Sequence, residues 1–271
     1  MKLQAAILDW AGTVVDHGSR APMGAFVLAF ATFGVTVSIA DARSPMGMAK
    51  WDHIRAVGQA PAVAASWRAR HGRDFNETDV DAIFRVFEPM NVAAVRDHAD
   101  LIPGALDAIA ALREQGLRIG ATTGYTSAIM DELALLAAAA GYAPDLTVCA
   151  GDLPAGRPSP LMMWYAMAKL GVWPAATVVK VDDTAPGIGE GVAAGTWTVG
   201  ITLTGNEVGL SAGELAALPE PERAAHRVRA GAVLTTAGAD FVIDSIAELP
   251  TVVATINARL ANGQRPGTTP T

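Results

Sequence analysis

Six short apolar runs recur along the sequence, and amphipathic Ala/Leu-rich segments separate several of them. The runs occupy residues 3–9, 117–122, 146–149, 177–182, 197–203 and 240–243. Each run has the length of a buried strand, and the intervening segments have the periodicity of helices that cover a sheet. This alternation predicts an α/β fold with a doubly wound, parallel, Rossmann-like sheet.

The stretch between the first and second runs shows helical periodicity and no convincing strand. Because a structureless connection of that length is unusual inside a compact domain, we expect an inserted α-helical unit. The predicted core comprises residues 1–19 and 100–260, and the predicted insertion comprises residues 20–99. Residues 261–271, rich in Gly, Pro and Thr, are expected to form a flexible tail.

Composition narrows the range of partners. Apolar residues make up 51% of the chain and charged residues 17%, which is typical of a globular protein. The net charge of −7 disfavours nucleic acid, because phosphate backbones need clustered Lys and Arg. The single cysteine, Cys149, excludes an intramolecular disulfide and a Cys-rich zinc site. Since no apolar stretch has the length of a membrane span, we expect a cytoplasmic protein without a membrane partner.

An acidic residue closes the first apolar run. Asp9 is the last residue of this run and precedes the turn-prone residues 11–13. In an open parallel sheet ligands bind beyond the carboxyl ends of the strands, so Asp9 is a candidate nucleophile. The alternative is that Asp9 only caps the following turn, and this segment by itself leaves both interpretations open.

Two further acids, Asp182 and Asp183, end the fourth run. If that strand lies next to the first, both acids join Asp9 at one edge of the sheet, where repulsion raises a pKa unless a cation is shared. A hard divalent ion with oxygen ligands, most simply Mg²⁺, is the predicted cation. The alternative is that Asp183 or Thr184 caps the next helix.

Two loops add residues that suit an anion. Thr123 and Gly124 follow the second run, and Arg157 lies in the loop after the third. Thr123 offers a hydroxyl donor, Gly124 allows the backbone to approach, and Arg157 carries a permanent charge with paired donors. Each is common in loops, but together they predict a pocket for phosphate-like oxygens.

The order of these motifs, an acid, a threonine, a cation and an acid pair, resembles the haloacid dehalogenase superfamily of phosphoryl-transfer enzymes over nearly the whole chain. The resemblance implies that Asp9 attacks phosphorus and that Thr123 belongs to the hydroxyl motif. It places Mg²⁺ at Asp9, Ala11 and the pair Asp182 and Asp183, with Asp183 the favoured member of the pair. It also implies that the helical insertion is a cap domain.

Two departures from the usual motifs sharpen this resemblance. Most phosphatases of the superfamily carry a second Asp two residues after the nucleophile, where this chain has Ala11, and Arg157 stands where Lys is usual. Both departures, and the motif Asp-Trp-Ala-Gly-Thr at residues 9–13, resemble the phosphonoacetaldehyde hydrolase family. The family implies a homodimeric enzyme that hydrolyses a small-molecule phosphonate, phosphonoacetaldehyde, to acetaldehyde and phosphate.

Residues 43–53 of the insertion resemble the Schiff-base lysine segment of that family, which implies that Lys50 forms the imine. On one helix, Met46, Lys50 and His53 share a face, so an apolar wall would lie beside the ammonium and lower its pKa. The resemblance further implies that His53 relays a proton to the imine. The expected lining of the substrate pocket is Ala11, Met46, Gly124 and Tyr125.

Two other functions stay open. A phosphate-ester phosphatase or sugar phosphomutase of the same superfamily would share most of these motifs, but Ala11 and Lys50 count against it. A non-catalytic binding protein on this fold is an alternative of another class. The presence of Asp9 counts against that second alternative.

Overall fold

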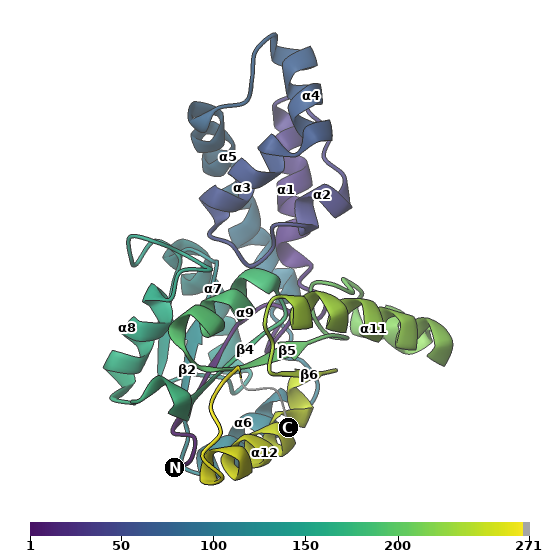
Figure 1. Ribbon diagram of the computed structural model, residues 1–271. Helices are drawn as coiled ribbons and strands as arrows, with labels where there is room; N and C mark the ends of the chain where they lie inside the picture. The colour runs from purple at the N-terminus through teal and green to yellow at the C-terminus, as the bar shows by residue number, and fades with distance from the viewer. Residues whose placement is uncertain (268–271) are drawn as a thin grey trace.

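Six parallel strands form one sheet in the order β3-β2-β1-β4-β5-β6 in the computed structural model, which describes residues 1–267 (Figure 1). The strands are β1 (Ala5–Leu8), β2 (Arg118–Thr122), β3 (Leu146–Val148), β4 (Val178–Asp182), β5 (Trp197–Ile201) and β6 (Phe241–Ile243). Each strand lies within one of the six apolar runs. The predicted α/β fold with a doubly wound parallel sheet is therefore confirmed.

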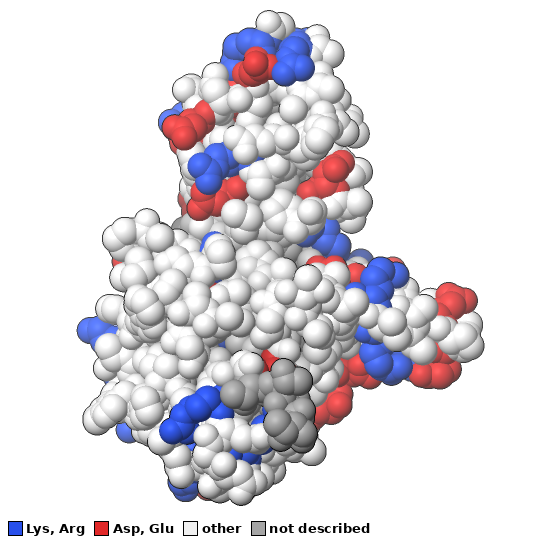
Figure 2. All heavy atoms as spheres, viewed as in Figure 1, with Lys and Arg blue, Asp and Glu red and all other residues white. Residues whose placement is uncertain are grey.

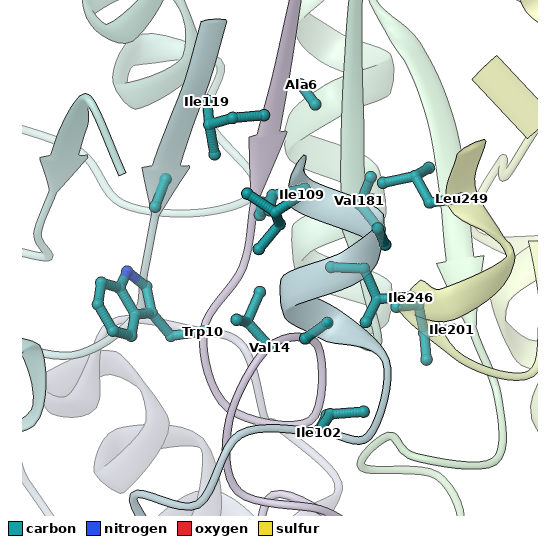
Figure 3. Close-up of a cluster of buried hydrophobic side chains, with 14 of the residues drawn as sticks. Ala6, Trp10, Val14, Ile102, Ile109, Ile119, Val181, Ile201, Ile246 and Leu249 are labelled. Atoms are coloured by element: carbon teal, nitrogen blue, oxygen red, sulfur yellow. The ribbon is translucent and has the colours of Figure 1, made fainter. Parts of the chain in front are cut away.

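Alternate residues of the strands contribute to two cores, one on each face of the sheet. Ala6 and Val181 belong to the core that includes α6, α7 and α12, whereas Ile7 packs with α8. Figure 3 shows the first core, with Ile109 of α6 lying over the strands. The elements that accompany the sheet are α6 (Ala105–Glu114), α7 (Ser127–Ala139), α8 (Leu161–Leu170), α9 (Ala185–Ala194), α10 (Ala212–Ala217), α11 (Glu220–Thr236), α12 (Leu249–Ala261), and the 3₁₀ turns η2 (Ala175–Thr177) and η3 (Ile246–Glu248).

Between β1 and β2 the described chain forms helices and only isolated β-bridges. Before α6, the helices in this stretch are α1 (Ala21–Thr32), α2 (Ile39–Arg43), α3 (Lys50–Gln59), α4 (Pro61–His71) and α5 (Glu77–Val95), followed by the 3₁₀ turn η1 (Arg96–His98). We call α1 to α5 the helical unit and the remaining elements around the sheet the sheet unit. The helical unit buries its own aromatic core, in which the rings of Phe26 and Phe87 stack 4.3 Å apart. In Figure 1 it rises above one edge of the sheet.

The chain continues beyond its last helix, α12. Ala261 is the last residue of α12, and the N–H of Gly267 donates to Asp240 (2.7 Å). Residues 268–271 of the predicted tail lie outside the described residues. On the face shown in Figure 2, positive and negative side chains are interspersed over the helical unit and α11. Among the helices that the structure describes, none has the length and apolarity needed to cross a membrane.

Candidate active site

Asp9 lies at the carboxyl edge of the sheet, directly after β1. Because β1 pairs with β4, Asp9 comes out beside Asp182, and its N–H donates to the carbonyl of Val181 (2.9 Å). The Asp9 side chain is buried. Burial, and then the charge of Asp182, raise the pKa of Asp9 to about 6 against the opposing effect of Arg157 and Lys180. The first strand and the fourth thus bring distant acids together.

Asp183 completes a group of three buried carboxylates whose oxygens lie within 4.8 Å of one another. Its Oδ1 accepts the Thr13 hydroxyl (3.1 Å) and its Oδ2 accepts the N–H of Asn206 (2.8 Å). Burial, followed by the charges of Asp9 and Asp182, raises the pKa of Asp183 well above its usual range. The two hydrogen bonds offset this only in part, and no cation among the described residues forms an ion pair with Asp183, which is the environment in which a divalent cation binds.

The negative charge of Asp182, in contrast, is offset by neighbouring cations and hydrogen-bond donors of the protein. Its Oδ1 accepts the N–H (3.0 Å) and hydroxyl (2.7 Å) of Thr184, and its Oδ2 lies 3.0 Å from Lys180 Nζ and 3.3 Å from Arg157 Nη1. Burial favours the neutral acid, but the two cations outweigh burial and hold the pKa of Asp182 below its usual range. The N-cap of α9 is Thr184, so capping does not occupy Asp183.

Behind these acids lies a buried charge network that sequence reasoning missed. Glu190 Oε2 accepts the Thr122 hydroxyl (2.8 Å) and Arg157 Nε (3.1 Å), and it lies 3.3 Å from Lys180 Nζ. Lys180 also donates to Thr122 Oγ1 (2.7 Å). One signal was available, because Lys180 stands between valines in a strand that is buried throughout, and a buried charge requires partners.

Arg157 is buried and directs its guanidinium at protein acceptors. Its Nη2 lies 2.8 Å from Asp9 Oδ1 and also donates to the carbonyl and hydroxyl oxygens of Thr122. Burial disfavours the charged form, but the carboxylates of Asp182, Asp9 and Glu190 outweigh it and raise the pKa of Arg157 above its usual value. A permanent cation therefore touches the candidate nucleophile.

Lys50 reaches the same region from the helical unit. Its Nζ lies 3.9 Å from Met46 Sδ, and the centroids of the Tyr125 and Phe26 rings lie 4.9 and 5.7 Å from it. The side chain is buried, and this desolvation lowers the pKa of Lys50 to about 8, with Asp9 opposing the shift. An amine with that pKa is neutral in about one molecule in ten at pH 7.

The prediction that Met46, Lys50 and His53 share one helix is wrong in one respect. Helix α3 begins at Lys50, and Met46 lies in the turn between α2 and α3. Met46 still meets Lys50, with its Sδ 3.9 Å from Lys50 Nζ. The physical reason for the turn is local: Pro45 has no N–H to donate to a helix, and Gly47 has φ of +92°, which no helical residue adopts.

His53 follows Lys50 by one turn of α3 and stacks on Phe26 with ring centroids 3.9 Å apart. Its Nε2 lies 2.7 Å from the carbonyl of Ala42, so Nε2 carries the proton and Nδ1 is an acceptor. Nδ1 is buried without a hydrogen-bond partner. Burial, and then the charge of Lys50, lower the pKa of His53 well below 6.5. His53 is therefore a neutral base.

A cavity of about 20 Å³ lies between the helical unit and the sheet unit. That volume holds about one water molecule. Gly124 of the sheet unit lies against the helical unit, where an added Cβ would come 2.5 Å from the carbonyl oxygen of Met48. The cavity brings together Asp9, Ala11, Met46, Lys50, Thr123, Gly124, Tyr125 and Arg157, all expected from the sequence, with Ser19, Gly47 and Thr184, which were not.

Comparison with known proteins places this arrangement in a family. A family described as haloacid dehalogenase-like hydrolase matches residues 3–195. The phosphonoacetaldehyde hydrolase of Paraburkholderia phytofirmans is 50% identical over 264 residues, which cover 97% of this chain and 99% of that protein. This chain belongs to the phosphonoacetaldehyde hydrolase family. The Klebsiella pneumoniae protein of the same name is 48% identical over 267 residues, covering 98% of this chain and 99% of its own.

The fold of this phosphonoacetaldehyde hydrolase family member agrees with the sequence relationship. A crystal structure of a phosphonoacetaldehyde hydrolase-like protein from Oleispira antarctica superposes with a TM-score of 0.97 at 41% identity, covering 98% of this chain and 96% of that one. The family resemblance inferred from the motifs is confirmed. The chain is a hydrolase, so the alternative of a non-catalytic binding protein is set aside.

Proposed function

We propose that this protein hydrolyses the carbon–phosphorus bond of phosphonoacetaldehyde, giving acetaldehyde and inorganic phosphate. Lys50 and Asp9 line the same cavity, and this observation is the main support for the proposal. Lys50 comes from the helical unit with a pKa of about 8, and Asp9 comes from the sheet unit. The names of the relatives support the same activity.

The lysine solves the difficulty of this bond. Attack at phosphorus would expel a carbanion, which is a far worse leaving group than an alkoxide. Neutral Lys50 adds to the aldehyde carbon, water leaves, and the imine nitrogen takes up a proton from solvent, so the carbon of a protonated imine stands two bonds from phosphorus. When the bond to phosphorus breaks, its electron pair forms the carbon–carbon double bond of an enamine and neutralises the imine nitrogen.

Asp9 supplies the nucleophile in this scheme. Its carboxylate attacks phosphorus in line, forming an aspartyl phosphate, while Arg157 and Thr123 bind the phosphonyl oxygens. Because the leaving carbon is already activated through the imine, no acid is needed beside Asp9, which fits Ala11 at that position. Protonation of the enamine carbon and hydrolysis of the imine release acetaldehyde, and water cleaves the aspartyl phosphate. Nδ1 of His53, an unpartnered acceptor, is the proposed proton relay near Lys50.

The acids fit a divalent cation, which we propose to be Mg²⁺. Asp182 already has Lys180 and Arg157 as partners and Asp9 has Arg157, whereas no cation among the described residues forms an ion pair with Asp183. Asp9, Asp183 and the carbonyl oxygen of Ala11 are therefore the proposed ligands, with Asp182 a supporting acid. When bound, the ion neutralises charge on the phosphonyl oxygens and on Asp9.

The helical unit is proposed to act as a cap that opens and closes, with residues 20–99 as its extent and 1–19 with 100–260 as the core. A cavity of about 20 Å³ cannot admit a seven-atom substrate, so binding requires the two units to separate. Closure then brings Lys50 to Asp9 and excludes bulk water.

The direct test is release of phosphate and acetaldehyde from phosphonoacetaldehyde, with and without Mg²⁺. Equal amounts of both products, dependent on Mg²⁺, support the proposal. Borohydride added during turnover should attach a two-carbon group to Lys50. Hydrolysis of phosphate esters without a covalent adduct at Lys50 would instead support a phosphatase.

The pH dependence of turnover follows from the lowered pKa of Lys50. Below a pKa of about 8 the neutral fraction of Lys50 rises tenfold per pH unit, so log kcat/KM should rise with a slope near one from about pH 6 to 8 and level off above. A pH–rate profile that is flat from 6 to 8 would contradict the role of Lys50.

We also propose a homodimer that uses the exposed aromatic face of α8 and the loop after it. The side chains on this face are exposed to solvent: Trp164 by 50%, Tyr165 by 39% and Trp173 by 71%. A second copy packed on this face would bury that apolar surface. Sedimentation equilibrium should give twice 27.9 kDa. Trp164→Glu with Trp173→Glu should weaken association at least about tenfold, whereas Leu135→Glu on α7 should not. A monomeric wild type would refute this face as an interface.

The location of the protein in the cytoplasm stays a prediction.

A further inference from the structure

Arg43, the last residue of α2, extends from the helical unit into the sheet unit. Its Nη1 lies 2.8 Å from the carbonyl oxygen of Asn206, 3.0 Å from Asn206 Oδ1 and 2.9 Å from the carbonyl oxygen of Gly18. Asn206 lies in the loop after β5, and Gly18 in the connection before α1. One guanidinium nitrogen therefore ties three segments together.

The loop of residues 205–209 is shaped to fit between Arg43 and Asp183. Gly209 has φ of +70°, and an added Cβ there would lie 2.6 Å from Cζ of Arg43. An added Cβ at Gly205 would lie 2.5 Å from Cβ of Asp183. The glycines thus allow the loop to touch the guanidinium on one side and the acid on the other.

Asn206 connects the two side chains through a single residue. Its N–H donates to Asp183 Oδ2 (2.8 Å), while its carbonyl and side-chain oxygens accept Arg43. Asn206 is buried, so these contacts are sheltered from water. Thr13 holds the other oxygen of Asp183. When the helical unit moves away, Asn206 loses the partner that fixes it, and Asp183 loses a fixed donor.

We propose that Arg43 is a positioning residue that orients Asp183 through Asn206 when the helical unit closes. This inference rests on the proposed function, in which Asp183 binds Mg²⁺ and the helical unit acts as a cap. The complete metal site and the closed cavity then form together. Hydrolysis is thereby restricted to the closed state, in which bulk water is excluded.

The experiment compares Arg43→Lys, which keeps the charge but loses the planar fork, with Arg43→Met, which loses both. Arg55→Lys is the matched control, because Arg55 pairs with Asp52 within the surface of α3. Two quantities are measured: the Mg²⁺ concentration that half-saturates phosphate release, and the Mg²⁺ dissociation constant from the shift in melting temperature. Trapping of the Lys50 imine with borohydride is measured in parallel.

If Arg43 positions Asp183, both Arg43 variants should need about tenfold more Mg²⁺ by both measurements, with imine trapping retained and Arg55→Lys unchanged. If Arg43 acts only as a nearby positive charge, Arg43→Met should bind Mg²⁺ more tightly and Arg43→Lys should match the wild type, which would overturn the proposal. Loss of imine trapping in step with phosphate release would overturn it too, because Arg43 would then serve closure alone.

A second variant keeps the test decisive if the Arg43 variants fail to fold. Asn206→Ala retains the N–H that meets Asp183 but removes the Oδ1 acceptor of Arg43, so it should weaken Mg²⁺ binding by about threefold. An unchanged Mg²⁺ requirement in Asn206→Ala would count against the relay. A wild type without imine trapping or phosphate release would refute the proposed function, whereas the melting shift with Mg²⁺ reports on Arg43 without turnover.

Discussion

Lys50→Arg should abolish turnover of phosphonoacetaldehyde, with kcat reduced by about 10⁴-fold or more. Arginine keeps the positive charge, but its guanidinium stays protonated and cannot condense with an aldehyde. Phosphate release is the measurement, and borohydride should leave the variant without an adduct. Binding of Mg²⁺ and phosphate should persist, because the acids and Arg157 belong to the sheet unit. Turnover within tenfold of wild type would remove the imine from the mechanism.

Lys50→Met is the control that separates catalysis from stability. Burial lowers the pKa of Lys50 from 10.5 to about 8, so the charged amine costs the folded state about 3 kcal/mol at neutral pH. The Met variant should therefore be inactive yet more stable, by up to about that amount. The cost is present below pH 8 and disappears as pH rises towards 10.5, so the difference in unfolding free energy should shrink over that window. A less stable Met variant would contradict the burial argument.

Asp9→Asn should stop phosphate release, again by about 10⁴-fold or more, because the amide cannot attack phosphorus. The variant should still form the imine at Lys50. Reduction with borohydride should therefore leave a two-carbon adduct that retains phosphorus on Asp9→Asn, whereas the wild-type adduct should have lost it. Mass spectrometry of the Lys50 peptide distinguishes the two adducts.

The thermal stability of Asp9→Asn gives a second test. Burial and Asp182 raise the pKa of Asp9, so without Mg²⁺ its charge is unfavourable at neutral pH and Asp9→Asn should melt no lower than wild type. Added Mg²⁺ should stabilise wild type more than the variant. Phosphate release near the wild-type rate would show that Asp9 is not the nucleophile.

The strands were predictable because parallel strands are buried on both faces. Such strands appear as short continuous apolar runs, and all six runs contain a strand. The turn at Met46 was not predicted, since three- and four-residue spacing suits a helix and Pro45 and Gly47 were not weighed against it. The spacing favours a helix, whereas proline and glycine favour a turn, and the structure has a turn at these residues.

The buried network of Lys180 and Glu190 shows a different limit. Lys180 stands between valines in a buried strand, but nothing in the local sequence identifies Glu190 of α9 as its partner; the burial of both side chains in the fold does. Their contacts explain why Asp182 is compensated and Asp183 is not. That distinction supports Asp183 as the proposed metal ligand, where the motif alone presents two adjacent acids.

The sequence by itself determined the elements of the fold, the candidate residues Asp9, Thr123, Arg157 and Lys50, and the family resemblance. These depend on periodicity and on short motifs, which are local properties of the chain. Only the tertiary structure decided that β1 lies beside β4, that Lys50 is desolvated against Tyr125, and that Arg43 reaches Asn206. Electrostatic environments depend on distance and burial between residues far apart in the chain, and no local pattern contains them.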